Sequence, residues 1–258
     1  MRSTLAFVFS AFVIGLSATA CTASIDSPPP RELKKSSSLP LERLSASYGA
    51  FSNGQSMDIF VAVLGDGFML LRDGDSVTAD VNGTGVPLTE RIEGDKVHYV
   101  GEVTAPPAEP VVTITFTRGA DKVVGKVRVG PNFEAKSPPT SAKLGDVIPL
   151  DLDPRPDLSS WQTILGPSLH HAIEVHGDCI DDKQQKIEVC AKDSPQGACK
   201  IEYPLPWDTS KVLLKDGSTG CEVEAQIRLE SPAPTWEGKF NGGFEGVQGR
   251  KFKLTLTK

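Results

Sequence analysis

The sequence has no stretch longer than a turn or two in which apolar residues recur with the 3.6-residue period of an amphipathic helix. This absence argues against a helical or α/β fold. The chain also lacks any run of clustered Lys and Arg, and its formal net charge is −6. Because nucleic-acid binding needs clustered cations to neutralise phosphates, we predict that nucleic acid is not a partner.

Recognisable catalytic motifs are also missing. The sequence contains no G-x-S-x-G, no H-E-x-x-H, no Gly-rich phosphate loop and no C-x-x-C pair. We therefore predict a protein that is not an enzyme, with no catalytic residues, no metal and no cofactor. A hydrolase that uses two carboxylates stays open as an alternative, because the sequence does not reveal which pair would act.

An apolar run at the N-terminus, residues 5–16, follows the positively charged Arg2. The run is too short for a membrane-spanning helix, which needs about 20 apolar residues. The next four residues are small, as a signal peptidase requires, so residues 1–20 are predicted to be a cleaved export signal. Ala18-Thr19-Ala20 on its own also fits ordinary secretion.

The small residues followed by Cys21 resemble the lipobox of bacterial lipoproteins. Ala18 stands where that motif usually has Leu. The resemblance implies that Cys21 becomes the first mature residue and carries acyl groups such as palmitate, which tether the protein to a membrane of the cell envelope. By the same resemblance, Thr22 in place of Asp implies the outer membrane. The alternative is a free or intermolecularly paired thiol at Cys21.

The segment that follows Cys21 is rich in Ser and Pro, including Pro28-Pro29-Pro30 and Ser36-Ser37-Ser38. It offers few large apolar residues to bury, so we predict that residues 21–43 form a flexible tether. The rest of the chain is long enough for two domains of about 100 residues each. We place them at residues 44–131 and 132–258.

Both predicted domains consist of short alternating segments bounded by Gly, Asp, Asn and Pro. The expected strands of the first domain are residues 56–64, 68–71, 76–81, 96–103, 111–117 and 121–129. The turn dipeptide Asn82-Gly83 closes one of them. The expected strands of the second domain are residues 144–150, 169–176, 186–192, 199–205, 221–229 and 252–257. This density of strands and turns is typical of β-sandwiches.

The chain resembles the immunoglobulin-like or fibronectin-III-like domains of secreted bacterial lipoproteins, most visibly in residues 133–150, where Ser-Pro-Pro precedes Lys-Leu-Gly-Asp-Val-Ile-Pro-Leu. The predicted fold class is therefore all-β, with two tandem Ig-like β-sandwiches. The resemblance implies a non-enzymatic interaction or structural module whose partner is an envelope protein or a glycan. Binding of carbohydrate or peptidoglycan stays open as an alternative.

Four cysteines lie in the second predicted domain, namely Cys179, Cys190, Cys199 and Cys221. Pro195 and Gly197 mark a turn that lets the two middle cysteines face each other. A nested arrangement, Cys190–Cys199 inside Cys179–Cys221, is preferred among three possible pairings. A zinc site is the rival, but the spacings lack the paired C-x2-C form and an exported chain meets an oxidising compartment.

Three further groups of residues could act as ligands or as plain structural residues. His170, His171 and His176 would not share a metal on a strand, because neighbouring positions point to opposite faces and equivalent positions lie too far apart. Asp151, Asp153 and Asp157 could bind calcium, although Arg155 among them argues for a plain loop. For Trp161, Trp207 and Trp236, core packing is the preferred role and a sugar-binding platform the alternative.

Overall fold

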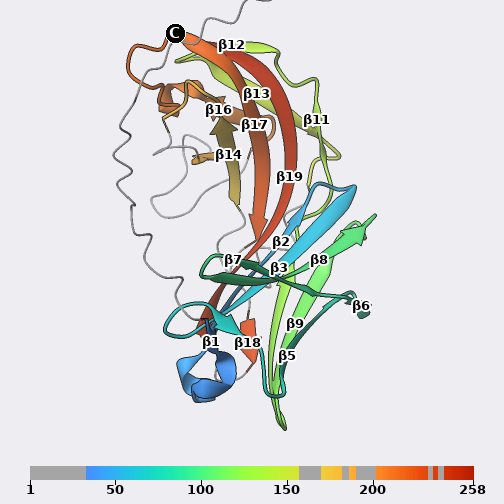
Figure 1. Ribbon diagram of the computed structural model, residues 1–258. Helices are drawn as coiled ribbons and strands as arrows, with labels where there is room; N and C mark the ends of the chain where they lie inside the picture. Colours follow the sequence, from blue (N-terminus) through green and yellow to red (C-terminus); the bar gives the residue numbers. More distant parts are fainter. Residues whose placement is uncertain (1–32, 157–169, 182–185, 190–201, 232–234, 238–240) are drawn as a thin grey trace, which may run out of the picture. The chain divides into compact units, whose positions relative to one another are not determined.

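The computed structural model describes residues 33–156, 170–181, 186–189, 202–231, 235–237 and 241–258 (Figure 1). Residues 32–258 form one compact unit. In the described ranges the regular elements are β-strands and three short 3-10 helices, η1 (Ser36–Ser38), η2 (Leu41–Arg43) and η3 (Thr209–Lys211). None of the described helices is long and apolar enough to cross a membrane. The all-β prediction is confirmed.

The first sandwich consists of two antiparallel sheets. One sheet has the order β2 (Ser45–Ser52), β3 (Ser56–Leu64), β8 (Lys96–Thr104) and β7 (Thr89–Glu93). The other has the order β10 (Asp121–Arg128), β9 (Val111–Arg118), β5 (Asp75–Val81) and β6 (Thr84–Val86). Lettered along the chain from A to G, with β6 as C′, these are the ABED and GFCC′ sheets of an immunoglobulin fold.

The second sandwich follows the same scheme. One sheet has the order β11 (Glu134–Lys136), β13 (Val147–Asp153) and β16 (Leu205–Asp208). The other contains β15 (Lys186–Val189), β14 (His170–His176), β17 (Gly220–Ser231), β19 (Asn241–Thr257) and β12 (Ser141–Lys143). β12 runs parallel to β19, as strand A′ does to strand G. The strand order therefore supports two tandem Ig-like sandwiches, as predicted.

Turn chemistry fixes the hairpin between β5 and β6. Asn82 and Gly83 have φ angles of 50° and 82°, both in the left-handed region, as a two-residue type I′ turn requires. The Asn82 side chain also accepts a 2.7 Å hydrogen bond from the backbone N–H of Val111. The predicted Asn-Gly turn is confirmed. The Asn82 side chain also joins the hairpin to the start of β9.

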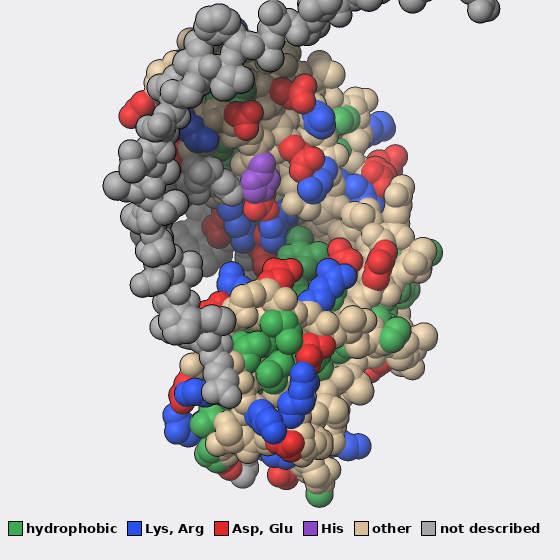
Figure 2. Space-filling view, viewed as in Figure 1, with side chains coloured by type: hydrophobic (Ala, Val, Ile, Leu, Met, Phe, Trp, Pro, Cys, Tyr) green, Lys and Arg blue, Asp and Glu red, His purple; other side chains and the backbone are tan. Residues whose placement is uncertain are grey.

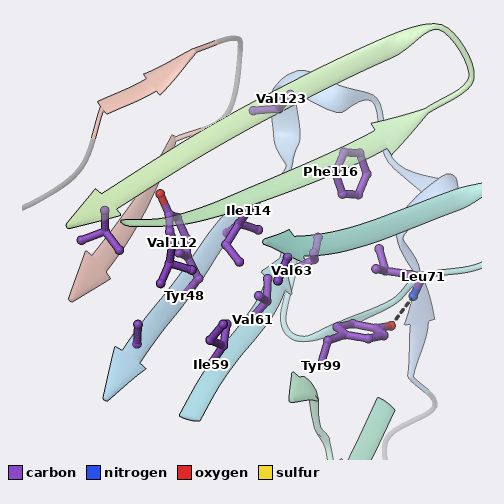
Figure 3. Close-up of a cluster of buried hydrophobic side chains, with 14 of the residues drawn as sticks. Tyr48, Ile59, Val61, Val63, Leu71, Tyr99, Val112, Ile114, Phe116 and Val123 are labelled. Carbon is purple, nitrogen blue, oxygen red and sulfur yellow. Dashed lines mark hydrogen bonds between the residues drawn. The ribbon is translucent and has the colours of Figure 1, made fainter. Parts of the chain in front are cut away.

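Each sandwich has its own apolar core. The first core packs Tyr48, Ile59 and Ile114 between the two sheets (Figure 3), and the second is built around Phe133, Trp207 and other fully buried side chains. Each large apolar side chain buried in this way contributes about 1.5–3 kcal/mol. The buried members of the first core fall within residues 44–129 and those of the second within residues 133–256. The domain bounds at residues 44–131 and 132–258 stay a prediction.

The hairpin of β17 and β19 extends beyond the second core and joins the two sandwiches. Residues 241–248 of β19 pair in parallel with the whole of β2, the edge strand of the first sandwich. β18 (Thr235–Glu237) pairs with β10, an outer strand of the other sheet. We call residues 235–237 and 241–248 the arm. Through it, β19 is one long strand shared by both sandwiches (Figure 1), and the sheet runs without a break from β15 to β7.

The junction between the sandwiches is polar and tightly packed. Arg250, 8% exposed, donates from Nε to Glu134 at 2.8 Å and from Nη2 to the side chain of Asn132. A Cβ atom at Gly130 would lie 2.7 Å from the side chain of Leu229, so any larger residue here would force that side chain to shift. The chain at Gly130, next to the predicted boundary between residues 131 and 132, is therefore a packed corner.

The end of the predicted tether is not flexible from residue 33 onward. β1 (Lys34–Lys35) pairs with β4 (Met69–Leu70), and three leucines of this segment pack against the first core. Arg118 donates hydrogen bonds to the carbonyls of Ser36 and Leu39, both at 2.7 Å. The composition of this segment predicted a tether because it has too few apolar residues to form a core by itself. Its leucines instead add to the core that the first sandwich already has. Residues 21–32 lie outside the described ranges.

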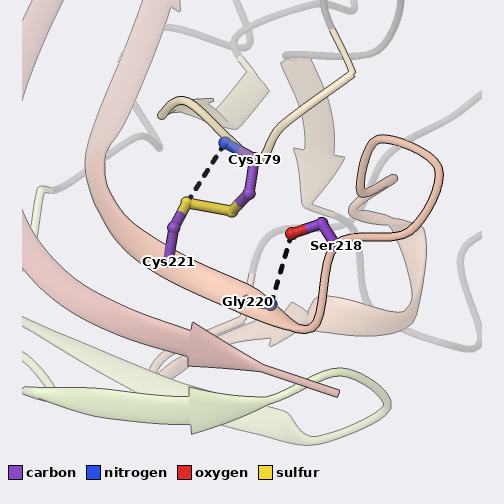
Figure 4. The surroundings of a disulfide bond; sticks show 4 residues. All are labelled: Cys179, Ser218, Gly220 and Cys221. Carbon is purple, nitrogen blue, oxygen red and sulfur yellow. Dashed lines mark hydrogen bonds between the residues drawn. A yellow bond between two sulfur atoms is a disulfide. The ribbon is translucent and has the colours of Figure 1, made fainter.

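The structure contains a disulfide between Cys179 and Cys221, whose Cα atoms are 5.8 Å apart (Figure 4). It joins the loop after β14 to the start of β17, two neighbouring strands of one sheet. This bridge matches the outer pair of the nested arrangement. Cys190 and Cys199 lie outside the described residues, so the inner bridge stays a prediction.

Candidate interaction surface

The tryptophans and histidines singled out in the sequence do not form a site in the described residues. Trp207 is fully buried and packs edge-to-face on Phe252, with ring centroids 6.2 Å apart. Trp161 and the side chain of Trp236 lie outside the described part of the structure. For Trp207, the core role is therefore correct and the sugar-platform role is wrong.

Of the three histidines on β14, the two whose side chains are described point to opposite faces of the strand, as strand geometry predicts. His171 is buried, and its Nε2 lies 2.9 Å from the hydroxyl of Tyr203. His176 is exposed, with its Nε2 3.2 Å from Glu174. Within the described ranges no three His, Cys, Asp or Glu side chains are grouped to hold a metal ion. Asp151 instead pairs with Arg155 at 2.9 Å.

The outer face of the β2-β3-β8 sheet carries an aromatic strip that the sequence analysis did not identify. Along each strand alternate residues point to the core, and those between them point outward. The outward positions include Phe51, Phe60 and His98, and Phe68 from the loop before β4 packs on the same face. All four side chains are half-buried. Their ring centroids form a chain with steps of 5.5, 6.4 and 5.3 Å.

Gly49 provides the seat for two of these rings. A Cβ atom at this position would lie 2.2 Å from the ring of Phe60 and 2.8 Å from that of Phe51. Gly49 is the register partner of Phe60, so the absence of a side chain on β2 lets the ring of β3 lie across it. Phe51 and Phe60 are then nearly parallel, with 12° between their planes. The pair forms a firmly supported apolar surface.

Two carboxylates flank the strip. Asp58 on β3 is the register partner of Phe51 on one side and of Glu102 on the other. Directly paired residues have Cβ atoms roughly 5 Å apart, so two like charges lie side by side, which is unfavourable. Both side chains are exposed, and neither forms an ion pair with any described residue.

The neighbouring face of the second sandwich is also charged, but there the charges neutralise each other. Arg228 lies between Glu174, Glu230 and Glu245, and Lys186 contacts Glu230 at 2.5 Å. Burial alone would lower the pKa of Arg228, but the hydrogen bond that it donates to Glu174 and the three carboxylate charges raise it. Figure 2 shows such interspersed acidic and basic side chains over one face of the molecule. This ion cluster is internally satisfied, unlike the pair Asp58 and Glu102.

Comparison with known proteins gives no family for this chain. No protein-family model matches the sequence, and no curated protein matches it significantly. The solved structures it resembles include the titin Ig tandem A164–A165 (9% identity, TM-score 0.23) and the tandem Ig repeats of Dlar (11%, 0.25), each covering 83% of this chain and 94% of the other. The Yersinia pseudotuberculosis adhesin InvE matches at 12% identity and a TM-score of 0.23, over 83% of this chain and 58% of the other. Scores this low carry no argument about function, and the Ig-like assignment rests on the strand order.

Proposed function

We propose that the protein is a non-enzymatic interaction module of the bacterial cell envelope, anchored by lipid on Cys21 to the outer membrane, with the aromatic strip as its binding face. The strip is the observation that carries the proposal. Aromatic side chains are enriched in protein–protein interfaces, where they bring large contact area at low entropic cost. Here they stand on a continuous sheet, which holds them in fixed positions.

Residues 33–43 pack against the first sandwich, and this packing sets how far the module stands from its anchor. Because the chain is fixed from residue 33, only the residues between Cys21 and Leu33 act as a spacer. At most about 3.6 Å per residue, this spacer spans no more than roughly 40 Å. The proposed binding face therefore serves partners close to the membrane surface.

The anchor is tested by the intact mass of the mature protein purified from membranes, compared with the Cys21→Ala variant. We expect a wild-type mass that begins at Cys21 and includes diacylglycerol and acyl groups, whereas the variant moves to the soluble fraction without them. The physical reason is that several acyl chains hold a protein stably, while this acidic chain has no basic cluster to bind anionic lipid. An unmodified wild-type mass with soluble protein would refute the anchor.

A further inference from the structure

We propose that the partner presents a basic segment, with Arg or Lys next to an apolar side chain, to the aromatic strip. The inference rests on the proposed function and specifies the partner's chemistry at the same surface. Phe51 and Phe60 supply the contact area, and Asp58 and Glu102 decide the charge of the occupant. A segment of this composition would place its apolar group on the rings and its cation between the carboxylates.

The carboxylates favour a cation because nothing in the described chain neutralises them. Asp58 and Glu102 are cross-strand neighbours of like charge, which lowers the stability of the sheet. Unfavourable pairs that nothing else in the fold offsets are typical of functional surfaces. Arg91 on β7 is the register partner of His98, whereas Arg228, which contacts Glu245 beside Gly49, is already paired with three carboxylates. His98 lies four residues from Glu102 along β8, which is about 13 Å. The end of the strip at Phe51 and Phe60 is therefore acidic.

The rings favour the same occupant. A guanidinium or ammonium group over a phenyl face gains electrostatic attraction from the ring, and more so when carboxylates lie beside it. The Gly49 seat supports both rings from below, so binding does not have to order them first. The surface is thus preorganised for a cation flanked by apolar groups.

The test measures binding of the mature full-length protein to three defined probes: the peptide acetyl-Arg-Leu-Arg-Leu-Arg-amide, its counterpart with Glu for Arg, and a β-1,4-linked hexamer of N-acetylglucosamine. We expect the basic peptide to bind with a Kd on the order of 10⁻⁴ M, weakening as salt is raised. The acidic peptide should not bind. Because these measurements are made in solution, they stand whether or not Cys21 carries lipid.

Variants locate the binding. Asp58→Asn with Glu102→Gln should weaken the basic peptide about tenfold. The matched control is Glu222→Gln with Glu224→Gln, which removes two carboxylates from β17, where they pair with Lys253 and Lys251, and should change affinity less than about twofold. Phe60→Leu, which keeps an apolar side chain over Gly49, should weaken binding several-fold.

Three results would overturn the proposal. Equal binding of the acidic peptide would exclude charge selection, and equal loss in both double variants would exclude this location. Binding of the sugar hexamer, abolished by Phe60→Leu while the basic peptide fails to bind, would assign the strip to a glycan instead.

Discussion

Replacing Arg118 with alanine is expected to lower the free energy of unfolding by about 3–5 kcal/mol, because it leaves a buried carboxylate without its partner. Asp75 has a side chain only 2% exposed, and Arg118 donates to it at 2.5 and 2.8 Å. Ser36 donates a further 2.5 Å hydrogen bond to the same carboxylate. The variant should also release residues 33–43 from the first sandwich, since Arg118 binds two carbonyls there.

The same carboxylate makes stability depend on pH. Burial alone would raise the pKa of Asp75, but the hydrogen bonds from Arg118 and Ser36, with the guanidinium charge, hold it below its usual value. The stabilising contribution is therefore present above the unfolded-state pKa of about 3.9 and is lost as pH falls through the lower folded-state value. Asp75→Asn should flatten this acid dependence.

Urea unfolding at pH 7, 4 and 3 measures both effects, and limited proteolysis detects release of residues 33–43. Arg43→Ala is the matched control, because Arg43 pairs with Asp66 on the surface, where both side chains are about half exposed. We expect the control to change stability by less than about 1 kcal/mol. A loss in Arg118→Ala no larger than in the control would contradict a structural role for the buried pair.

Replacing both Cys179 and Cys221 with serine is expected to lower the free energy of unfolding by about 4 kcal/mol. The two cysteines are 42 residues apart, and the cross-link removes the entropy of that loop from the unfolded chain. The loop contains β15 and β16, which belong to different sheets of the second sandwich. The loss should therefore destabilise the second core as a whole.

Chemical unfolding of the double variant, compared with the unreduced wild type, tests this expectation. Mutation is preferable to a reducing agent, which would also act on Cys190 and Cys199. The slope of the unfolding curve reports any change in the compactness of the unfolded state. A change in stability below about 1 kcal/mol would mean that the bridge does not constrain the unfolded chain in this way.

The sequence pattern predicted a strand correctly where core-facing apolar residues alternate with outward-facing residues along the whole strand. The segment at 56–64 was predicted with the bounds that β3 has, because apolar core positions alternate there with Asp58 and Phe60. β2 was missed, since its small residues give little contrast between the two faces. We expected a strand at 199–205, but β16 begins only at Leu205. Residues 199–201 of the predicted strand lie outside the described ranges.

The first half of β19 shows what sequence alone does not provide. We expected a strand at 252–257, yet β19 starts at Asn241 and passes through four glycines that weaken any strand prediction. Its pairing partner β2 lies nearly 200 residues earlier in the chain. The aromatic strip was missed for the same reason, because Phe51, Phe60 and His98 become neighbours only through sheet register. Cys21 lies outside the described residues, so its lipidation stays a prediction.

The central structural claim is that the arm joins the two sandwiches into one sheet that holds the strip in place, and amide hydrogen exchange tests it most directly. In the native protein, amides of residues 241–248 that bond to β2 should be protected as long as those of residues 252–256 in the second core. Rapid exchange throughout residues 241–248, with residues 252–256 still protected, would contradict the claim and leave two sandwiches without a shared strand.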